Sequence, residues 1–431
     1  MTLQKFIEQL ADFALQKDRQ VPDFYRDCLL NYIAVTISGA NTQAVDTVVK
    51  ASLNNGEGHY QPVHRKEHVT LSDCILIDCF SSAIQAYDDI HFATTLHPCG
   101  PVASVIFGIA RSQTVTLKQA LNALMIGMEV ECRMATLMLS QEAQAAQAWY
   151  PTGITGGIGA TVAASRLYGF NKEQMIEAMA LAATYASGTR GTHGSMAGSF
   201  VPAIAAKSGY QAANLIRHGF TCHPNALYGQ NGYILQIAQN PNIEEAVKDL
   251  GSHYQSMSSS CKPYPLGFIS FAPIEACKAI DCDPCTIKRV ELHVSSRVYM
   301  LGHNHQPKTQ YDALVSLPYI VAQTLINHER ITIPLSDNFM IDDNVARLME
   351  RITLIEDNTM TDGEAKLMVE VEREVLSSYC EVAPGSKRKP MSSDAIKEKV
   401  YKLIPEHAQR LIDLINDQDH LAVNDILNEL N

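Results

Sequence analysis

The chain has 431 residues, of which 46% are hydrophobic and 19% are charged. This composition is typical of a globular protein and excludes disordered, collagen-like and coiled-coil chains. Asp and Glu number 46 against 34 Lys and Arg, which gives a formal net charge of −12. A nucleic-acid or anionic-membrane surface needs excess positive charge, so we expect neither partner. A local site for a small anionic metabolite remains compatible with this balance.

Residues 3–13 carry apolar side chains at helical spacing and lack the continuous apolar stretch of a signal peptide. No apolar run approaches the length of a membrane span. We therefore expect a cytoplasmic protein whose 11 cysteines are reduced. Cys282 and Cys285 form the one CxxC pair, and a structural zinc would need a second pair at matching spacing, which the sequence lacks. We expect no metal.

Helical patterns follow one another from the first residues to about residue 260, among them 24–38 and 71–88. Capping-box spacing predicts further helix starts at Thr116 and Asn171. These patterns predict a large all-helical part of the chain.

The pattern changes near residue 285, where 288–294 alternates apolar and polar side chains as a half-buried strand does. Two further strands are predicted at 351–355 and 366–371, with a helix at 313–327 between them. This indicates a smaller α+β unit. The last forty or so residues return to helix, with predicted segments at 393–403, 406–415 and 421–430.

Polar side chains gather at the end of the apolar segment 71–88. Asp88, Asp89, His91 and His97 lie there and in the loop expected to follow. Loops at the ends of rigid elements often present catalytic groups. The alternative is helix capping, turn formation and salt bridges. A metal site is not expected, because adjacent residues on a helix point in different directions.

A second segment combines Tyr150 with a glycine-rich stretch, 153–157, that leads into a helix. Backbone N–H groups of such a loop can bind an anion with help from the helix N-terminus. The stretch has no Gly-Lys-Ser/Thr ending and no strand before it, which argues against a nucleotide. A third segment contains Arg190 and His193. The planar guanidinium suits a carboxylate, and a flexible surface loop is the alternative.

Lys262 lies between the helical and the α+β parts, and Pro263 and Pro265 stiffen the backbone that follows it. A lysine that is partly desolvated at a domain junction becomes a usable base. The alternative is a solvent-exposed linker lysine.

These segments resemble the MmgE/PrpD family, whose best-known members are 2-methylcitrate dehydratase, cis-aconitate decarboxylase and iminodisuccinate epimerase. The resemblance rests on DDIHFATTLHPCGPVASVIFGIA, YPTGITGGIGATVAASRLYGFNKEQ, YASGTRGTHG and AAKSGYQAANLIRHGFT. It continues through CKPYP and PKTQYDALVSLPY to PMSSDAIKEK. The motifs follow one another over nearly the whole chain.

The resemblance implies a mainly α fold with an all-helical domain at 1–265 and an α+β lid at 266–392. C-terminal helices at 393–431 are expected to return to the helical domain. The resemblance also implies a homodimer and an active site between the domains that needs no organic cofactor or metal. The chemistry would begin with the proton next to a carboxylate of a small anionic substrate.

The resemblance implies that His97 and Lys262 are active-site residues, because they match the family's motif positions. It also implies that Tyr319 is a tyrosine that the lid brings to the site. Lys207 matches a lysine of the family that is either in the site or structural. We expect catalysis by His97, Tyr150 and Lys262. The expected substrate-binding residues are Asp88, Asp89, His91, Arg190, His193, Lys207 and Tyr319.

Three positions depart from the decarboxylases of the family. Tyr150 and Gly267 stand where those enzymes have histidines, and Gly198 stands where they have a second active-site lysine. We therefore do not expect decarboxylation of cis-aconitate.

Three functions remain open. The first is a cofactor-independent lyase of the dehydratase type, in which Lys262 or His97 removes the α-proton of a small polycarboxylate. Arg190 and the 153–157 stretch would hold the carboxylates and stabilise the developing charge. The second is an epimerase of a dicarboxylate such as iminodisuccinate, with Tyr150 and Lys262 on opposite faces of one carbon. The third is a catalytically silent binding homologue.

Overall fold

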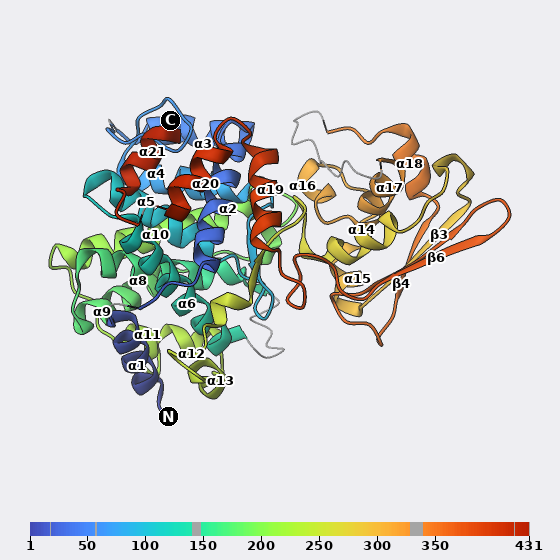
Figure 1. The fold of residues 1–431 in the computed structure, drawn as a ribbon. Helices are drawn as coiled ribbons and strands as arrows, with labels where there is room; N and C mark the ends of the chain where they lie inside the picture. The colour runs from blue at the N-terminus through green and yellow to red at the C-terminus, as the bar shows by residue number, and fades with distance from the viewer. Residues whose placement is uncertain (18, 57, 140–147, 328–338, 418, 431) are drawn as a thin grey trace.

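The computed structural model describes residues 1–17, 19–56, 58–139, 148–327, 339–417 and 419–430. Figure 1 shows a large helical domain beside a smaller domain of helices and strands. The predicted fold class, mainly α with a smaller α+β domain, is confirmed. Where the structure describes the chain, no helix is long and apolar enough to cross a membrane.

The large domain is built mainly from helices. The longer helices are α1 (Leu3–Leu15), α2 (Phe24–Gly39), α3 (Gln43–Leu53), α4 (Leu71–Ala83), α5 (Cys99–Ser112), α6 (Leu117–Leu139), α8 (Pro151–Tyr168), α9 (Lys172–Thr184) and α10 (Met196–Arg217). The shorter ones are α11 (Asn225–Tyr228), α12 (Tyr233–Ile237) and α13 (Ile243–Val247). Both predicted capping boxes are present: Thr116 and Gln119 cap α6, and Asn171 and Gln174 cap α9.

The C-terminal segment returns to the large domain after the smaller one. Its helices are α19 (Ser393–Leu403), α20 (Ala408–Asp417) and α21 (Val423–Leu430). Figure 1 shows them against the large domain, where α19 and α20 pack on α2 and α21 packs on α5. The three helices predicted at the C-terminus are confirmed, with ends that differ by at most two residues.

Helices α6, α8 and α10 form the centre of the large domain, with α8 packed on both of the others. A Cβ atom at Gly159 would lie 2.7 Å from the carbonyl oxygen of Gly127, and one at Gly209 would lie 2.5 Å from that of Gly157. Only glycine therefore fits at these crossings. The richness of this region in Gly, Ala and Ser is explained by backbone-to-backbone helix packing.

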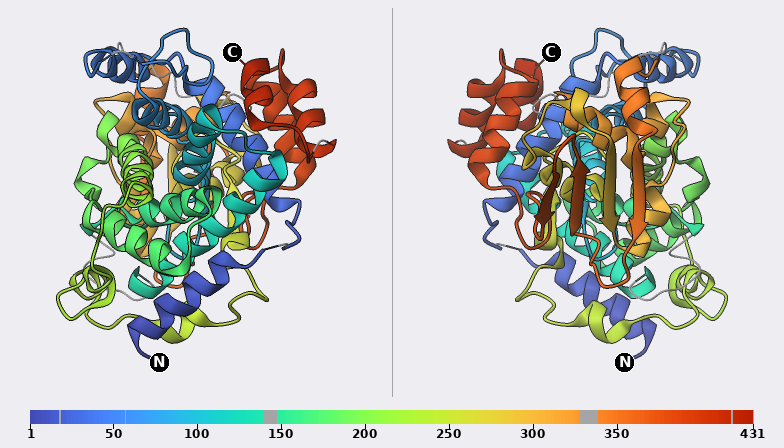
Figure 2. Two further views of the ribbon diagram at one scale, coloured as in Figure 1. Left: turned by 90° about the vertical axis from the view of Figure 1, so that its left-hand side faces the viewer. Right: turned by 90° about the vertical axis from the view of Figure 1, so that its right-hand side faces the viewer.

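The smaller domain has a four-stranded sheet with helices on one face. The strands are β3 (Arg289–Val294), β4 (Ile352–Glu356), β5 (Ala365–Glu370) and β6 (Val375–Cys380), in the order β4-β3-β5-β6. β3 pairs parallel with β4 and antiparallel with β5, and β5 pairs antiparallel with β6. The helices are α14 (Phe271–Lys278), α15 (Ser296–Gly302), α16 (Gln310–Ala313), α17 (Leu317–Asn327) and α18 (Asp343–Met349). The right-hand view of Figure 2 has the sheet in front and the helices behind it.

The predicted strands are confirmed, and two other details differ. Burial alternates along β3, because its apolar side chains face the helices. The helix predicted at 313–327 is present as α17 but begins later, at Leu317, because Ser316 accepts a hydrogen bond from the N–H of Tyr319 at the start of this helix. The short helix α16 ends at Ala313. Strand β6 was not predicted, since it lies at the sheet edge and has no fully buried residue.

A two-stranded sheet joins distant parts of the chain beside the junction of the domains. β1 (Asp89–His91) pairs antiparallel with β2 (Ser259–Cys261), with Asp89 opposite Cys261. The sequence predicted a loop after α4, whereas the structure has a short strand at this place. The pairing sets the residues that precede β1 beside those that follow β2.

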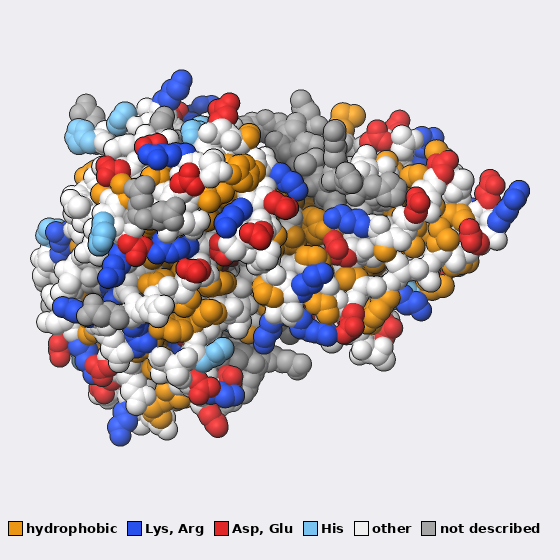
Figure 3. All heavy atoms as spheres, viewed as in Figure 1, with side chains coloured by type: hydrophobic (Ala, Val, Ile, Leu, Met, Phe, Trp, Pro, Cys, Tyr) orange, Lys and Arg blue, Asp and Glu red, His pale blue; other side chains and the backbone are white. Residues whose placement is uncertain are grey.

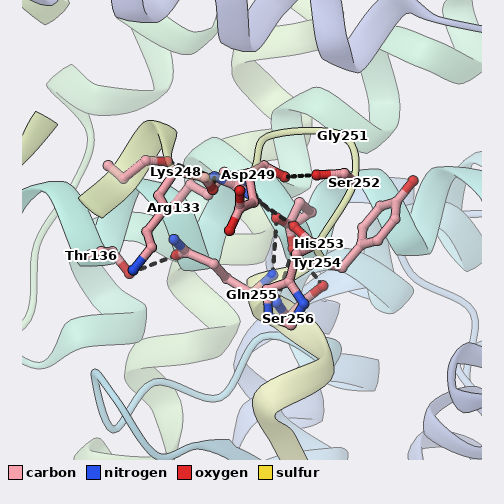
Figure 4. Close-up of polar contacts among 12 residues, drawn as sticks. Arg133, Thr136, Lys248, Asp249, Gly251, Ser252, His253, Tyr254, Gln255 and Ser256 are labelled. Atoms are coloured by element: carbon pink, nitrogen blue, oxygen red, sulfur yellow. Dashed lines mark hydrogen bonds and ion pairs between the residues drawn. The ribbon is translucent and has the colours of Figure 1, made fainter. Parts of the chain in front are cut away.

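A buried ion pair on α6 holds the segment that leads to β2. Arg133 donates through Nε to Glu129 Oε1 at 2.6 Å, and both side chains are fully buried. Glu129 also accepts hydrogen bonds from the N–H groups of Gln255 and Ser256. The Nη atoms of this arginine donate to the carbonyl oxygens of Ala246, Lys248 and His253. Figure 4 shows Arg133 beside Lys248 and His253. Because every charge has partners, this burial is tolerated.

Asp89 and Glu131 are buried acids whose carboxyl oxygens are not fully hydrogen-bonded within the described residues. Asp89 Oδ1 and both carboxylate oxygens of Glu131 have no hydrogen-bond partner among the described residues. Burial, followed by the negative charge of Asp88, raises the pKa of Asp89 to about 7. Burial also raises the pKa of Glu131 well above its ordinary value. In a low-dielectric core the neutral acid is the favoured form.

The space-filling view in Figure 3 shows acidic and basic side chains interspersed on one face of the molecule. Among the coloured residues of that face there is no continuous basic patch. This distribution agrees with the net charge of −12.

We predict that Asp89 makes the protein less stable as the pH rises. Its folded-state pKa of about 7 lies above the ordinary value, so the protonated acid contributes stability that is complete at acidic pH and is lost as the pH rises through about 7. Asp89→Asn keeps an acceptor for the N–H of Cys99 and cannot titrate. Urea unfolding from pH 5 to 8 should show a decrease in unfolding free energy that is larger in the wild type, by on the order of 1–3 kcal/mol.

The exposed acid Asp394 provides the control for this measurement, since its side chain is 92% exposed. Asp394→Asn should leave the pH dependence of the wild type intact. Parallel curves for the wild type and Asp89→Asn would contradict the prediction.

Candidate active site

A cavity of about 460 Å³ lies where the two domains meet. The large domain contributes a polar wall and the smaller domain an apolar one. The polar side chains include those of Asp88, Thr95, His97, Tyr150, Arg190, His193 and Lys262, with Ser195 and Ser199 beside them. The apolar wall consists of Phe268, Ile269, Met300, Leu301, Leu314 and Val315, next to Tyr311. Few polar groups converging in a largely apolar cavity are typical of a small-molecule site.

Asp88 connects two of the three predicted catalytic residues. Its Oδ1 accepts a hydrogen bond from Lys262 Nζ at 2.6 Å, and its Oδ2 lies 3.1 Å from His97 Nδ1. Burial raises the pKa of Asp88, but the contacts with His97 and Lys262 outweigh burial and hold this pKa well below its ordinary value. Asp88 is therefore a carboxylate at neutral pH.

His97 has one ring nitrogen fixed by the protein. Its Nδ1 lies 2.6 Å from the carbonyl oxygen of Asp89 as well as beside the Asp88 carboxylate. Both neighbours can only accept hydrogen bonds, so Nδ1 carries a hydrogen, and Nε2 of the neutral ring keeps its lone pair. The backbone N–H of His97 donates to Thr152 Oγ1 on α8 at 2.8 Å. This geometry suits Nε2 to accept a proton.

Lys262 directly follows β2 and is only 3% exposed, so it is not a solvent-exposed linker residue. Its backbone N–H donates to the carbonyl oxygen of Asp88 at 3.0 Å, in addition to the contact between the side chains. A lysine paired with a carboxylate suits proton donation and anion binding better than proton abstraction. The geometry therefore favours His97 over Lys262 as the base.

Tyr150 is the N-cap residue of α8 and lines the cavity. Its ring stacks on that of His193, with centroids 5.5 Å apart, and lies 6.1 Å from the ring of His97. Burial and then the charge of Asp88 raise the pKa of Tyr150, and the opposing effect of Arg190 is smaller. The phenol of Tyr150 therefore keeps its proton at neutral pH, and the nearby Arg190 does not turn it into a phenolate. In this form Tyr150 can act as a proton donor.

Arg190 and His193 belong to a short turn of 3-10 helix and the residue after it. Arg190 Nη2 donates to Thr95 Oγ1 at 3.1 Å, and the Arg190 carbonyl oxygen lies 2.7 Å from His193 Nδ1. The half-buried guanidinium lines the cavity, where it can bind a carboxylate. These contacts anchor the segment to the loop between β1 and α5.

Two cavity residues have unusual backbone conformations. Ala86 has a φ of 51° and Thr95 a φ of 56°, in the left-handed region that non-glycine residues rarely adopt. Both line the cavity. Strained backbone of this kind is concentrated at functional sites, where the surrounding structure holds it in place.

The glycine-rich stretch 153–157 does not form the expected anion-binding loop. Helix α8 begins at Pro151, so these glycines lie inside it. They are buried where other segments cross: a Cβ at Gly153 would lie 2.2 Å from the carbonyl oxygen of Ser187. The expectation is wrong because the glycines serve close packing and not ligand contact.

Asp89 and His91 point away from the cavity, contrary to the expected role in substrate binding. Asp89 Oδ2 accepts a hydrogen bond from the N–H of Cys99 at 3.1 Å, at the start of α5. The Nδ1 of His91 lies 2.8 Å from Thr94 Oγ1, and burial lowers the pKa of His91 to about 4. The neutral imidazole stabilises the turn that carries Thr95 and His97.

Lys207 and Tyr319 also lie outside the cavity. Lys207 on α10 forms an ion pair with Asp73 on α4 at 2.7 Å, so its role is to join helices. Tyr319 is 2% exposed in the core of the smaller domain, because the start of α17 turns it inward, and its hydroxyl accepts a hydrogen bond from Gln323. The lid tyrosine that lines the cavity is instead Tyr311.

Sequence reasoning missed Thr95 and Tyr311, although both stand within motifs of the family resemblance. Threonine and tyrosine occur too widely for their residue type to indicate a site. Only the closeness of Thr95 to His97 in the sequence could have suggested that Thr95 lines the cavity. Gly198 and Gly267, the two glycines at which the sequence was expected to depart from the decarboxylases, both line the cavity. Neither position places a charged side chain on this part of the wall.

The described residues contain no group of three or more His, Cys, Asp or Glu that could hold a metal ion. Cys282 is half-buried and Cys285 is exposed, and both are free thiols. The imidazole, phenol, ammonium and guanidinium groups that line the cavity can transfer protons and bind a carboxylate.

Comparison with known proteins gives matches over most of the chain. The model of the MmgE/PrpD N-terminal domain matches residues 4–246, and that of the MmgE/PrpD C-terminal domain matches residues 264–418. The cis-aconitate decarboxylase of Aspergillus terreus is 22% identical over 294 residues, which are 62% of this chain and 59% of that protein. The chain thus matches about three fifths of the length of this relative.

A second relative, the cis-aconitate decarboxylase-like protein oryM of Aspergillus oryzae, is 22% identical over 409 residues, which are 87% of this chain and 84% of that protein. Identity at this level does not transfer an activity. The family models of the N-terminal and C-terminal domains, however, match most of this chain, and they match it in the order in which the family has them. The protein belongs to the MmgE/PrpD family.

Proposed function

We propose that the protein is a cofactor-independent lyase of the dehydratase type that acts on a small polycarboxylate. The observation that carries the proposal is the Asp88 carboxylate between Lys262 and His97 in the cavity. The Asp88 carboxylate holds a base, His97, and a cation, Lys262, side by side, and Arg190 lies on the same wall of the cavity. The relatives named cis-aconitate decarboxylase support a lyase that acts on a polycarboxylate.

In the proposed reaction, Nε2 of His97 takes the proton from the carbon next to a carboxylate. The charge that develops on that carboxylate is stabilised by the guanidinium of Arg190 and the ammonium of Lys262. Tyr150 gives its phenolic proton to the leaving hydroxyl group as the carbon–oxygen bond breaks. Water and an alkene result, and the proton held by His97 restores the phenol through solvent.

Dehydration fits the site better than decarboxylation or epimerisation. The family resemblance implies active-site side chains in the decarboxylases at the positions of Gly198 and Gly267, and these glycines leave the wall bare. An epimerase needs acid/base groups on opposite faces of one carbon, whereas His97, Tyr150 and Lys262 all belong to the large domain, opposite a mainly apolar wall. A homologue without catalytic activity would not need to keep the Asp88–Lys262 ion pair, at 2.6 Å, in this cavity.

The reaction type can be tested with a panel of C4 to C7 hydroxy- and unsaturated polycarboxylates in deuterated water. We expect loss of water, seen as an alkene by NMR and ultraviolet absorption, from at least one hydroxy acid. Deuterium at the α-carbon of two interconverting stereoisomers, with no alkene, would establish an epimerase. Release of CO₂ would establish a decarboxylase, and no reaction across the panel would favour the silent homologue.

We predict that His97→Ala and Lys262→Ala each lower kcat by about two to four orders of magnitude, because each removes a positioned acid, base or cation. Both variants should remain folded by circular dichroism. Steady-state kinetics with the substrate found in the panel checks this prediction. Lys207→Met is the matched control, since that lysine pairs with Asp73 outside the cavity, and it should keep the wild-type kcat. Near wild-type turnover by Lys262→Ala would contradict the assigned role.

We predict that Tyr150→Phe lowers kcat by about two orders of magnitude or more and leaves the melting temperature nearly unchanged. Phenylalanine keeps the ring that stacks on His193 and lacks only the hydroxyl group. Kinetics and thermal unfolding of the same preparation separate the two effects. Full turnover by Tyr150→Phe would show that the hydroxyl group does not donate the proton.

A further inference from the structure

A lysine of the C-terminal helix α19 has its ammonium group buried beside the candidate site. Lys399 is 3% exposed. Its Nζ donates to Asn31 Oδ1 at 2.6 Å, to the carbonyl oxygen of Tyr87 at 2.7 Å and to the carbonyl oxygen of Lys262 at 3.0 Å. It also lies 3.7 Å from the centroid of the Tyr87 ring. All three donors of the ammonium group are thus used.

Two of these acceptors belong to the backbone that carries the ion pair of the site. Tyr87 directly precedes Asp88, and the other carbonyl is that of Lys262 itself. One ammonium group therefore binds both chain segments whose side chains meet at 2.6 Å. The backbone N–H of Lys262 also donates to the carbonyl oxygen of Asp88, so the two segments are joined directly as well as through Lys399.

Stability alone does not explain a lysine at this place. Its hydrogen-bond acceptors are all neutral, and burial lowers the pKa of Lys399 to about 7. The ionisable groups around it are Asp88, Asp89, Lys262 and the thiol of Cys261. An apolar side chain of similar volume would avoid the desolvation penalty of the charge. The ammonium group is retained at a position where it restricts two active-site segments.

The path of the chain adds a second connection. Before α19, the segment that returns from the smaller domain crosses β2, where the N–H of Met391 donates to Ser260 Oγ at 3.1 Å. A Cβ at Gly385 would lie 2.4 Å from the ring of Pro263, so the same segment also covers the residue after Lys262. The C-terminal part of the chain thus lies directly over the backbone of the site.

We propose that Lys399 is a positioning residue, which holds the backbone of Tyr87 and Lys262 and thereby sets the geometry of the Asp88–Lys262 ion pair. The C-terminal helix α19 is by this inference a part of the active-site framework. Its catalytic consequence rests on the proposed function, whereas its effect on the two backbone segments does not.

The test compares Lys399→Met with Lys397→Met on the same helix. Methionine keeps much of the side-chain volume of lysine and removes the ammonium group. The side chain of Lys397 is 35% exposed and its ion-pair contact, with Asp394, is at 3.8 Å, which makes it the matched control. Both variants are measured in the full-length protein, at a temperature well below the melting temperature of each.

Hydrogen–deuterium exchange needs no substrate and forms the first measurement. In Lys399→Met, we expect the amides of residues 88–91 and 259–262 to exchange about tenfold faster than in the wild type, since local opening is easier without the ammonium group. Exchange in α6 and α8 should be unchanged, as should every segment of Lys397→Met. Wild-type exchange at 259–262 in folded Lys399→Met would overturn the proposal.

Kinetics form the second measurement, with the polycarboxylate that the wild type converts. We expect Lys399→Met to lower kcat about 10- to 100-fold and to change KM less, because misplaced catalytic groups act on the chemical step. A purely structural lysine would lower the melting temperature without this loss, and a kcat within about twofold of the wild type would overturn the proposal. If the wild type converts no polycarboxylate, the proposed function fails and the exchange measurement alone decides the role of Lys399.

Asn31→Ala keeps the test decisive if Lys399→Met does not fold. It removes one acceptor of the ammonium group and leaves both backbone contacts. We expect a smaller effect of the same kind, with exchange at 259–262 and kcat altered about threefold to tenfold. Unchanged exchange and unchanged kcat in folded Asn31→Ala would then overturn the proposal.

Discussion

The candidate site depends on one buried carboxylate held between two nitrogen groups. Removing Asp88 from water disfavours its charge, and only the contacts with Lys262 and His97 keep it ionised. The same contacts determine what the neighbours can do. His97 is oriented with its free nitrogen available, and Lys262 is presented as a paired cation. Base, cation and orientation therefore follow from a single electrostatic arrangement.

Much of the large domain serves to hold that arrangement. The ion pair of Arg133 and Glu129 anchors the chain just before β2, and the pairing of β1 with β2 aligns Asp89 with Cys261. Close helix packing at the glycines of α8 positions the start of this helix, where Tyr150 is located. A rigid framework is needed because an error of about 1 Å between reacting groups can reduce a rate a hundredfold.

The smaller domain has a different part in the site. It provides the apolar wall, which excludes water from one side and strengthens the interactions of the charges on the other. Because the cavity lies between two separate hydrophobic cores, its width depends on how the domains pack and not on either core alone. Specificity for the unreactive part of a substrate would be determined by Phe268, Leu314 and their neighbours.

Local patterns in the sequence were sufficient for most elements. Capping boxes marked the starts of α6 and α9, and alternation marked β3, because these signals arise from hydrogen bonding and burial within a few residues. Family motifs pointed to His97, Tyr150, Lys262 and Arg190, which all line one cavity. Motif membership was a poorer guide to Tyr319, which the fold turns into a core.

The sequence by itself determined the fold class, the change from helices to an α+β unit, and the residue types available for proton transfer. Only the tertiary structure decided which of these residues meet. Asp88 and Lys262 are 174 residues apart, and Lys399 lies a further 137 residues beyond Lys262. No periodicity extends over such separations. The contacts between these residues are determined by helix packing and strand pairing, which bring backbone carbonyls and charged side chains together only when the whole chain is folded.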